Sequence, residues 1–359
     1  MRINRIEARA FKVPTDRPES DGTLQWDSTT LVVAWAYADG MRGMGYTYSH
    51  AAAVRLITDT LSEVVIGRDA MDLPGAWAAM VGSIRNLGNS AVCMMAVSAV
   101  DAALWDLKAR ILGVPLAGLL GRVRESVPVY GSGGFTSYTV EELKDQLSYW
   151  VAEGIPRVKM KIGRDPGEDP YRVEAAREAI GEDAELFVDA NGAYSRKQAL
   201  YMADIMSEMD VSWFEEPVYH LDTEGLRLVC DRTPSGMDVS AGEYGFYITD
   251  FMRLLGNGAV DVLQADATRC GITGFIQAAR LCEGFMVPLS SHCAPALHLH
   301  ACAALGPVRH MEYFHDHVRI EKMLFDGVVE QKGGTLTPDM TSSGMGLELK
   351  EADALKYEY

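Results

Sequence analysis

The sequence predicts an α/β fold, a closed (β/α)8 barrel of the TIM type preceded by an α+β lobe. The chain has 359 residues, which suits one barrel with an additional lobe. From residue 127 on, short runs rich in β-branched and aromatic residues alternate with amphipathic stretches. Acidic residues close three successive runs, as expected where the carboxyl ends of parallel strands meet at one rim.

The residues before 127 mix strand-like and helical patterns. Residues 29–38 (TTLVVAWAYA) are β-branched and aromatic, end at the turn Asp39-Gly40 and are followed by a short run that reaches Tyr48. This arrangement predicts a β-hairpin. In 51–65 and 92–111, apolar residues recur at helical spacing. We therefore expect an α+β lobe at the start of the chain.

Eight strand-like runs follow, separated by amphipathic stretches long enough for crossover helices. An open, doubly wound sheet is the structural alternative, but eight repeats favour a closed barrel. The predicted strands are 127–132, 157–163, 185–191, 211–217, 238–243, 260–266, 286–292 and 308–314, and the predicted helices include 140–153, 172–180, 196–208 and 272–283.

The composition indicates a soluble globular protein. The 33 basic and 50 acidic residues give a net charge of −17, which argues against nucleic acid and anionic membranes as partners. The six cysteines form no C-x-x-C pair and no compact disulfide framework, so we expect a reduced, cytoplasmic compartment. The N-terminal residues lack the apolar run of a signal peptide, and no membrane span is predicted.

The predicted strand 157–163 (RVKMKIG) carries two lysines on one face. Side chains alternate along a strand, so Lys159 and Lys161 point the same way. Lysines often protect an exposed sheet edge, but the second strand of a closed barrel has no free edge. A cation a few ångströms away disfavours a second ammonium group, so we expect Lys159 to lower the pKa of Lys161.

Carboxylates end the next three predicted strands. Asp189, Glu215 and Glu243 are separated by 26 and 28 residues, about one β/α unit each, which would bring them side by side at one rim. Each could separately be a solvated or helix-capping acid. Three converging carboxylates repel one another unless a cation joins them, and an all-oxygen set favours Mg²⁺ before Mn²⁺ or Ca²⁺. Glu216 should point to the opposite face and support the site from behind.

The remaining strand ends continue this pattern. Asp266 and His292 close adjacent runs and suit a dyad in which the carboxylate fixes the imidazole tautomer and raises its pKa. Taken alone, His292 would be a hydrogen-bonded core or rim histidine. Glu312 lies within the last run. No other histidine closes a strand opposite an acid, so we expect no role for His298, His300, His310, His315 and His317.

The ordered set Lys159-Met160-Lys161, Asp189-Ala190-Asn191, Glu215-Glu216-Pro217, Gly242-Glu243, Asp266 and Ser291-His292 resembles the enolase superfamily, and within it the mandelate racemase subgroup (mandelate racemase/muconate lactonizing enzyme-like). The resemblance covers nearly the whole chain. It implies a capping domain in residues 1–125, a catalytic barrel in 126–335 and a C-terminal segment, 336–359, that returns to the capping domain.

The resemblance also implies roles for the site residues. Mg²⁺, with Mn²⁺ as a possible substitute, would be held by Asp189, Glu215 and Glu243, one ion per active site. Lys161 and the His292–Asp266 dyad would transfer protons on opposite faces of a carboxylate substrate whose α-proton is removed to give an enediolate. Glu312 would hydrogen-bond the substrate carboxylate. Members commonly have two glycines where this chain has Gly271 alone, which predicts a different loop behind Asp266.

We expect dehydration of an acid sugar, an aldonate or aldarate, to a 2-keto-3-deoxy acid. This choice rests on the family and on the polar segment 19–27, which suits hydroxyl recognition. Trp26, Tyr46 and Asn191 are the expected substrate contacts. A racemase or epimerase and a lactone cycloisomerase are alternatives, and a non-catalytic sugar-acid binding protein is a more distant one. Family members are often symmetric assemblies, so we also expect a homo-oligomer.

Overall fold

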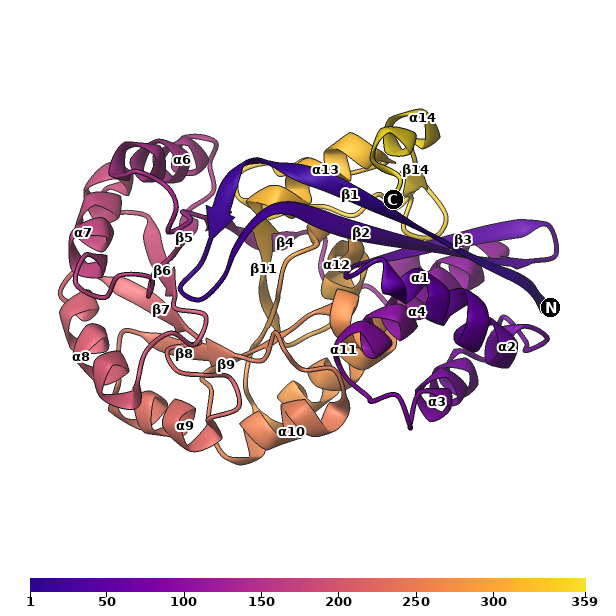
Figure 1. The fold of residues 1–359 in the computed structure, drawn as a ribbon, viewed down its shortest axis with the longest axis horizontal. Helices are drawn as coiled ribbons and strands as arrows, with labels where there is room; N and C mark the ends of the chain where they lie inside the picture. Colours follow the sequence, from indigo (N-terminus) through magenta and orange to yellow (C-terminus); the bar gives the residue numbers. More distant parts are fainter.

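The computed structural model describes residues 1–359 and contains a closed barrel of eight parallel strands (Figure 1). Consecutive strands pair in chain order, and β11 pairs with β4 to close the sheet. The predicted barrel is thereby confirmed, with most strands a few residues shorter than expected. The strands are β4 (Val127–Gly133), β5 (Arg157–Lys161), β6 (Glu185–Asp189), β7 (Val211–Glu215), β8 (Asp238–Ala241), β9 (Val262–Ala265), β10 (Leu289–Ser291) and β11 (Val308–Phe314).

The strand register places the chemically important residues at one level. Lys161 is the partner of Asp189 across β5 and β6, and Asp189 is the partner of Glu215 across β6 and β7. Strands β6 and β7 end at these acids. Asn191 and Glu216, just beyond, have positive φ angles of 45° and 39°, so the chain turns out of the strand there.

Helices surround the barrel, as Figure 1 shows. Two of them begin with a capping box, at Thr139 with Glu142 and at Ser195 with Gln198, which satisfies backbone N–H groups at the helix start. The helices are α6 (Val140–Ala152), α7 (Asp169–Ile180), α8 (Arg196–Ser207), α9 (Thr223–Arg232), α10 (Ile248–Gly256), α11 (Ala267–Phe285), α12 (Pro295–Ala304) and α13 (His315–Leu324). None of the helices is long and apolar enough to cross a membrane.

The N-terminal lobe consists of a three-stranded antiparallel sheet and a group of helices. Its strands are β1 (Ile3–Ser20), β2 (Gln25–Ala38) and β3 (Met41–Tyr48), which confirms the predicted hairpin and adds a long first strand that was not expected. A Cβ atom on Gly43 or Gly45 would lie 2.3 Å from backbone atoms of α4, so these glycines permit close packing. The helices are α1 (Ala52–Leu56), the π-helix η1 (Ile57–Leu61), α2 (Ser62–Val65), α3 (Leu73–Ser83), α4 (Ala91–Ile111) and α5 (Leu116–Leu120).

Helix α11 is kinked at Gly271, whose φ of +70° and ψ of 168° interrupt the helical backbone. Asp101 of α4 contacts the turn that follows. Its carboxylate accepts hydrogen bonds from the backbone N–H (2.8 Å) and the hydroxyl (2.7 Å) of Thr273. The single glycine therefore suffices for the bend, and the N-terminal lobe is fastened to the helix that follows Asp266.

The C-terminal segment returns to the start of the chain. Strand β14 (Glu348–Leu349) pairs with β12 (Phe325–Asp326), and β13 (Thr335–Leu336) pairs with β4. Arg9 of β1 forms ion pairs with Glu351 and Glu358 at 2.7 and 2.6 Å. Helix α14 (Glu351–Ala354) and the 3-10 helix η2 (Leu355–Tyr357) complete the chain. We propose that the domains meet after residues 125 and 335, next to β4 and β13.

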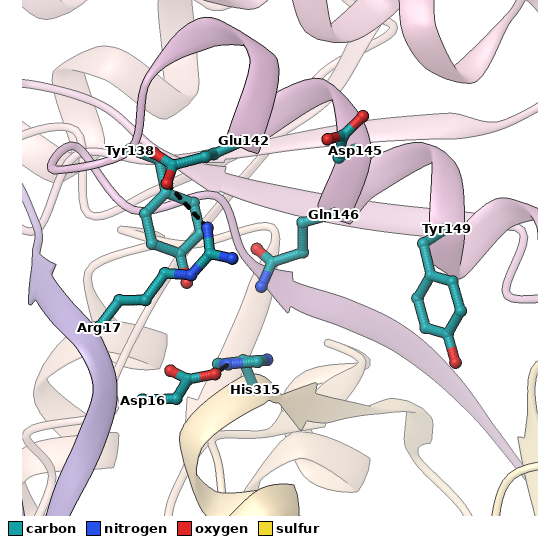
Figure 2. A pocket seen from close by; sticks show the side chains of 8 residues that line it. All are labelled: Asp16, Arg17, Tyr138, Glu142, Asp145, Gln146, Tyr149 and His315. Carbon is teal, nitrogen blue, oxygen red and sulfur yellow. Dashed lines mark hydrogen bonds and ion pairs between the residues drawn. The ribbon is translucent and has the colours of Figure 1, made fainter.

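The β1–β2 hairpin extends across the barrel towards α6 (Figure 1). Ser20 and Thr136 share a hydrogen bond of 2.6 Å between their hydroxyl groups, and Ser137 donates to the carbonyl of Pro18 at 2.7 Å. A cavity of about 390 Å³ lies beside this contact, between the end of β1, helix α6 and His315 (Figure 2). The hairpin thus covers part of the barrel rim.

Candidate active site

Three carboxylates converge at the rim of the barrel, two of them at strand ends. Asp189 ends β6, Glu215 ends β7, and Glu243 follows β8; one oxygen of each lies within 4.8 Å of the others, and all three side chains are buried. Gly242, with a φ of +129°, shapes the turn that carries Glu243. Clustered, buried carboxylate oxygens are the donor set of a hard divalent cation, so these residues fit the expected metal.

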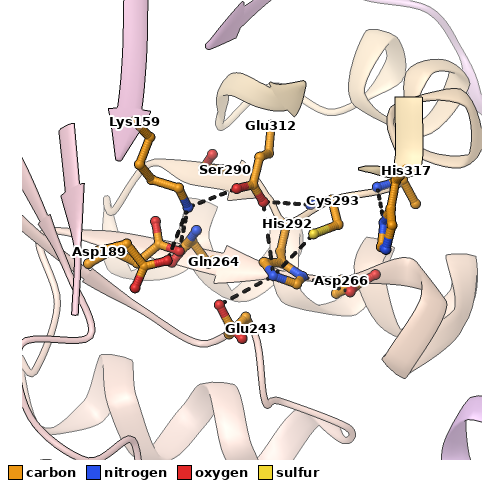
Figure 3. A network of polar contacts seen from close by, with 12 residues as sticks. Lys159, Asp189, Glu243, Gln264, Asp266, Ser290, His292, Cys293, Glu312 and His317 are labelled. Carbon is orange, nitrogen blue, oxygen red and sulfur yellow. Dashed lines mark hydrogen bonds and ion pairs between the residues drawn. The ribbon is translucent and has the colours of Figure 1, made fainter. Parts of the chain in front are cut away.

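Both lysines of β5 contact these acids, and Figure 3 shows Lys159 directed towards Asp189 and Glu312. The Lys159 ammonium lies 2.6 Å from Glu215, 2.8 Å from Glu312 and 3.5 Å from Asp189, and Lys161 donates a short hydrogen bond to Asp189. Burial lowers both lysine pKa values, but the neighbouring carboxylates outweigh it and raise them above the ordinary lysine value. Lys159 lowers the pKa of Lys161, as expected, but the surrounding acids outweigh this effect and keep Lys161 charged in this arrangement.

The Asp266–His292 dyad is present. The Nδ1–H of His292 donates to Asp266 at 2.8 Å, which leaves Nε2 as the nitrogen available for proton transfer. Burial lowers the pKa of His292, but Glu243 and the bond to Asp266 outweigh it and raise the pKa. Asp266 also accepts the backbone N–H of Thr268 at the start of α11, so it is held from two sides. The Nε2 atom lies 3.3 Å from the sulfur of Cys293.

Glu312, on β11, is fully buried, as are Asp189 and Glu215. Its carboxylate pairs with Lys159 and accepts the backbone N–H of Cys293 at 2.7 Å. Burial raises the pKa of Glu312, but Lys159, His292 and Lys161 together outweigh it and hold the pKa well below the ordinary value. It is not among the residues that line the cavity at this site, so its contact with a substrate stays a prediction.

A cavity of about 360 Å³ opens between the rim of the barrel and the β1–β2 hairpin. Trp26 and Asn191 line it, as expected of substrate contacts, but Tyr46 does not. Tyr46 is fully buried and donates to Glu321 at 2.6 Å, whereas Tyr48, on the same face of β3 and nearer its end, reaches the cavity. Strand alternation could not separate these two tyrosines, because residues two apart share a face.

Sequence reasoning missed several residues that line the cavity, among them an arginine, a histidine and a cysteine. The Arg269 guanidinium donates to the backbone carbonyl of Glu243 at 2.9 Å and stacks 4.4 Å above the ring of Tyr244. His317, for which no role was expected, stacks on Tyr48 at 3.5 Å, and its Nδ1 accepts the N–H of Ala294. Burial lowers the pKa of His317 to about 3, so it is a neutral imidazole with its proton on Nε2. The cysteine that lines the cavity is Cys293.

Glu216 lies beside the acidic triad without joining it. Its side chain is buried, one of its oxygens has no hydrogen-bond partner, and burial together with the charge of Glu243 raises its pKa well above the ordinary value. An indirect role of Glu216 behind the triad stays a prediction.

Two family models match the chain. Residues 5–121 match the mandelate racemase/muconate lactonizing enzyme N-terminal domain, and residues 142–353 match the enolase C-terminal domain-like family. The chain belongs to the mandelate racemase/muconate lactonizing enzyme family. The resemblance inferred from the strand-end residues is thereby confirmed.

Individual members of this family resemble the chain over its length. A mandelate racemase/muconate lactonizing enzyme-like protein from Rubrobacter xylanophilus is 54% identical, with a TM-score of 0.98 and full coverage of both chains. The 3,6-anhydro-alpha-L-galactonate cycloisomerase of Streptomyces coelicolor is 30% identical over 98% of this chain and 99% of its own. The L-talarate/galactarate dehydratase of Salmonella typhimurium is 32% identical over 87% of this chain and 78% of its own; its structure with Mg and L-lyxarohydroxamate has a TM-score of 0.90 and covers 100% of this chain and 93% of its own.

Proposed function

We propose that the chain is a Mg²⁺-dependent enzyme that removes the α-proton of a sugar acid and dehydrates it to a 2-keto-3-deoxy acid. The observation that carries this proposal is one cavity that presents Lys161, the dyad histidine His292 and an acid of the buried triad together. A binding protein needs the triad for a cation but has no use for two proton-transfer groups, which argues against the non-catalytic alternative.

The metal would be held by Asp189, Glu215 and Glu243. When bound, Mg²⁺ would stabilise the negative charge that develops on the substrate carboxylate as the α-proton leaves, which is usually the largest contribution in such reactions. Lys159 pairs with Glu312 beside this position, and its ammonium group is suited to orient the same carboxylate. Charged groups that are already in place cost no reorganisation at the moment of reaction.

Two residues would carry the protons. Lys161 would take the α-proton from one face of the substrate after the cation has displaced this lysine from Asp189. His292 would donate the proton of Nε2 to the β-hydroxyl group, which leaves as water while the α,β double bond forms. The resulting enol then becomes the 2-keto-3-deoxy acid. Asp266 holds the Nδ1–H of His292 and so keeps Nε2 directed to the substrate.

The same pair of groups also permits two alternative reactions. Return of a proton from the opposite face would give racemisation or epimerisation. If a ring oxygen within the substrate is added or eliminated, the enzyme is a cycloisomerase of a lactone or an anhydro sugar. The Streptomyces relative is a cycloisomerase and matches nearly the whole chain, which makes this reaction the second candidate. The Salmonella dehydratase supports dehydration, the reaction proposed above.

An exchange experiment tests the shared first step. We expect Mg²⁺-dependent exchange of the α-proton with deuterium from D₂O for at least one member of an acid-sugar library, and its loss in Lys161→Ala. Semicarbazide-reactive keto products then identify β-elimination: the reaction is a dehydration if the product is lighter than the substrate by one water, and a cycloisomerisation of an anhydro sugar if the two masses are equal. Exchange without keto products points to epimerisation. Exchange that persists in Lys161→Ala would remove this lysine from its proposed role.

Calorimetry tests the metal site separately. Asp189→Asn and Glu215→Gln should each weaken Mg²⁺ binding, whereas Glu321→Gln, a buried acid outside the triad, should not. Unchanged affinity in the first two variants would show that the ligands are misassigned. We further propose a homo-oligomer on the basis of the family resemblance, and light scattering of the purified protein would reveal a monomer if this is wrong.

A further inference from the structure

A second group of metal-type ligands lies outside the active-site cavity, where the β1–β2 hairpin meets the barrel. Asp16 and Glu19 come from the end of β1, and His315 is the first residue of α13. One ligand atom of each lies within 4.8 Å of the others, and Nε2 of His315 is 3.0 Å from Asp16. Figure 2 shows Asp16 and His315 facing each other at the edge of the cavity of about 390 Å³.

Glu19 is the unusual member of this group because it is fully buried. One carboxylate oxygen accepts the indole N–H of Trp26 at 2.8 Å, but the other is buried without any hydrogen-bond partner. Burial, together with the negative charge of Asp316, raises the pKa of Glu19 to about 8. A buried carboxyl oxygen without a partner costs free energy in either protonation state, so the position calls for a ligand.

The cationic side chains nearby are already engaged. Arg17 pairs with Glu142 at 2.8 Å, and Arg319 donates to Asp316 at 2.5 Å and to the carbonyl of Pro14 at 2.6 Å. Neither arginine forms an ion pair with Asp16 or Glu19. The two carboxylates and the imidazole therefore form a set of metal-type ligands with which neither arginine is paired.

We propose that Asp16, Glu19 and His315 bind a second divalent ion, of the zinc class. One imidazole and two carboxylates form the mixed nitrogen and oxygen set typical of Zn²⁺, Co²⁺ or Mn²⁺, whereas Mg²⁺ prefers oxygen ligands alone. The partial exposure of Asp16 and His315 to the cavity leaves room for a water molecule as a fourth ligand. This site is separate from the triad and does not depend on the proposed reaction.

The ion would join the two parts of the molecule. Asp16 and Glu19 belong to the hairpin and His315 to the barrel, so bound metal fastens the hairpin over the rim. The effect would reach the active site through Trp26, which bonds to Glu19, lines the active-site cavity and packs edge-on against Phe135 at 5.8 Å. Metal at this position would therefore hold one wall of that cavity.

A titration with Zn²⁺ in excess Mg²⁺ tests the proposal, because Mg²⁺ occupies the oxygen site first. Calorimetry should find one equivalent of Zn²⁺ on the wild-type protein, weakened at least tenfold in Glu19→Gln and in His315→Gln. Asp145→Asn is the matched control, since Asp145 lines the same cavity outside the ligand group and its change should leave the affinity unaltered. Asp16→Asn, at a more exposed position, replaces Glu19→Gln if that variant does not fold.

Co²⁺ provides a second measurement. Its visible absorption should show a four-coordinate site that disappears in His315→Gln and persists in Glu215→Gln. Co²⁺ bound only at the triad would give the reverse pattern, with absorption lost in Glu215→Gln and kept in His315→Gln, and would overturn the proposal. Absence of any Zn²⁺ binding in excess Mg²⁺, or equal affinity in the wild type and His315→Gln, would overturn it as well.

Discussion

Replacing Lys159 by methionine tests how the buried charges are balanced. The Lys159 side chain is fully buried, and its ammonium contacts Glu215 at 2.6 Å, Glu312 at 2.8 Å and Asp189 at 3.5 Å. Methionine keeps the apolar stem but leaves three buried carboxylates without their common cation. Removing one partner of a buried ion pair costs about 3–5 kcal/mol, so we expect a loss of this size in the metal-free protein.

The loss converts to a shift in melting temperature. An unfolding entropy of about 2.1 cal/mol/K per residue, taken over the 359 residues of the chain, gives about 0.75 kcal/mol/K. A loss of about 3–5 kcal/mol then lowers Tm by about 4–7 °C. Differential scanning calorimetry in EDTA measures this shift directly.

Lys161→Met is the matched control for this prediction. Lys161 forms an ion pair with Asp189 alone, which still has Lys159 at 3.5 Å after the change. We therefore expect a smaller decrease in Tm for Lys161→Met than for Lys159→Met. Equal decreases in Tm for the two variants, or a Tm of Lys159→Met equal to that of the wild type, would refute the idea that Lys159 is the common counterion of the buried acids.

Three further predictions concern the dyad and the contact between the lobes. Asp266→Asn should lower kcat on the best sugar acid by about 10²–10⁴-fold with little change in KM, since the orientation of its partner imidazole is lost; an unchanged kcat would contradict this. Gly271→Ala should destabilise the fold by about 1–3 kcal/mol in urea titrations, because φ is +70° and the added Cβ would lie 2.7 Å from Asp101. Gly284→Ala, where a Cβ meets nothing within 4 Å, should be neutral or stabilising. Burial raises the pKa of Asp101 from 3.8 to about 7, so the folded chain keeps a proton that the unfolded chain releases. Stability should therefore fall by about 1.4 kcal/mol per pH unit as pH rises between these values and level off above them. In urea titrations over this pH range Asp101→Asn should abolish that slope, and a slope that persists would assign it to another group.

The barrel and the acids at its rim could be predicted from the sequence because both depend on local patterns repeated at one spacing. Asp189 and Glu215 are separated by one β/α unit, and parallel pairing in register brings them level. The same reasoning placed His292 beside Asp266, whose strands are neighbours. The loop behind Asp266 did not disturb this pair, because Gly271 alone provides the positive φ that the bend requires.

The residues that sequence reasoning missed are placed by contacts between distant segments. His317 lines the cavity because Ala294, with a φ of +39°, directs its N–H to the imidazole and because Tyr48 of the N-terminal lobe stacks on the ring. Arg269 is fixed by the backbone carbonyl of Glu243 on another loop. Neither contact has a spacing or a pattern in the chain, so only the folded structure brings these residues to the site.

The folded structure also distinguishes the roles of Lys159 and Lys161. Lys159 pairs with Asp189, Glu215 and Glu312, whereas Lys161 pairs with Asp189 alone, so the acids hold the two lysines unequally. A cation on the triad would compete with Lys161 for Asp189, the single acid with which that lysine pairs. Lys159 would keep Glu312, which lies outside the triad. Metal binding therefore frees one lysine and leaves its neighbour charged, which is why Lys161 is the better candidate for the base.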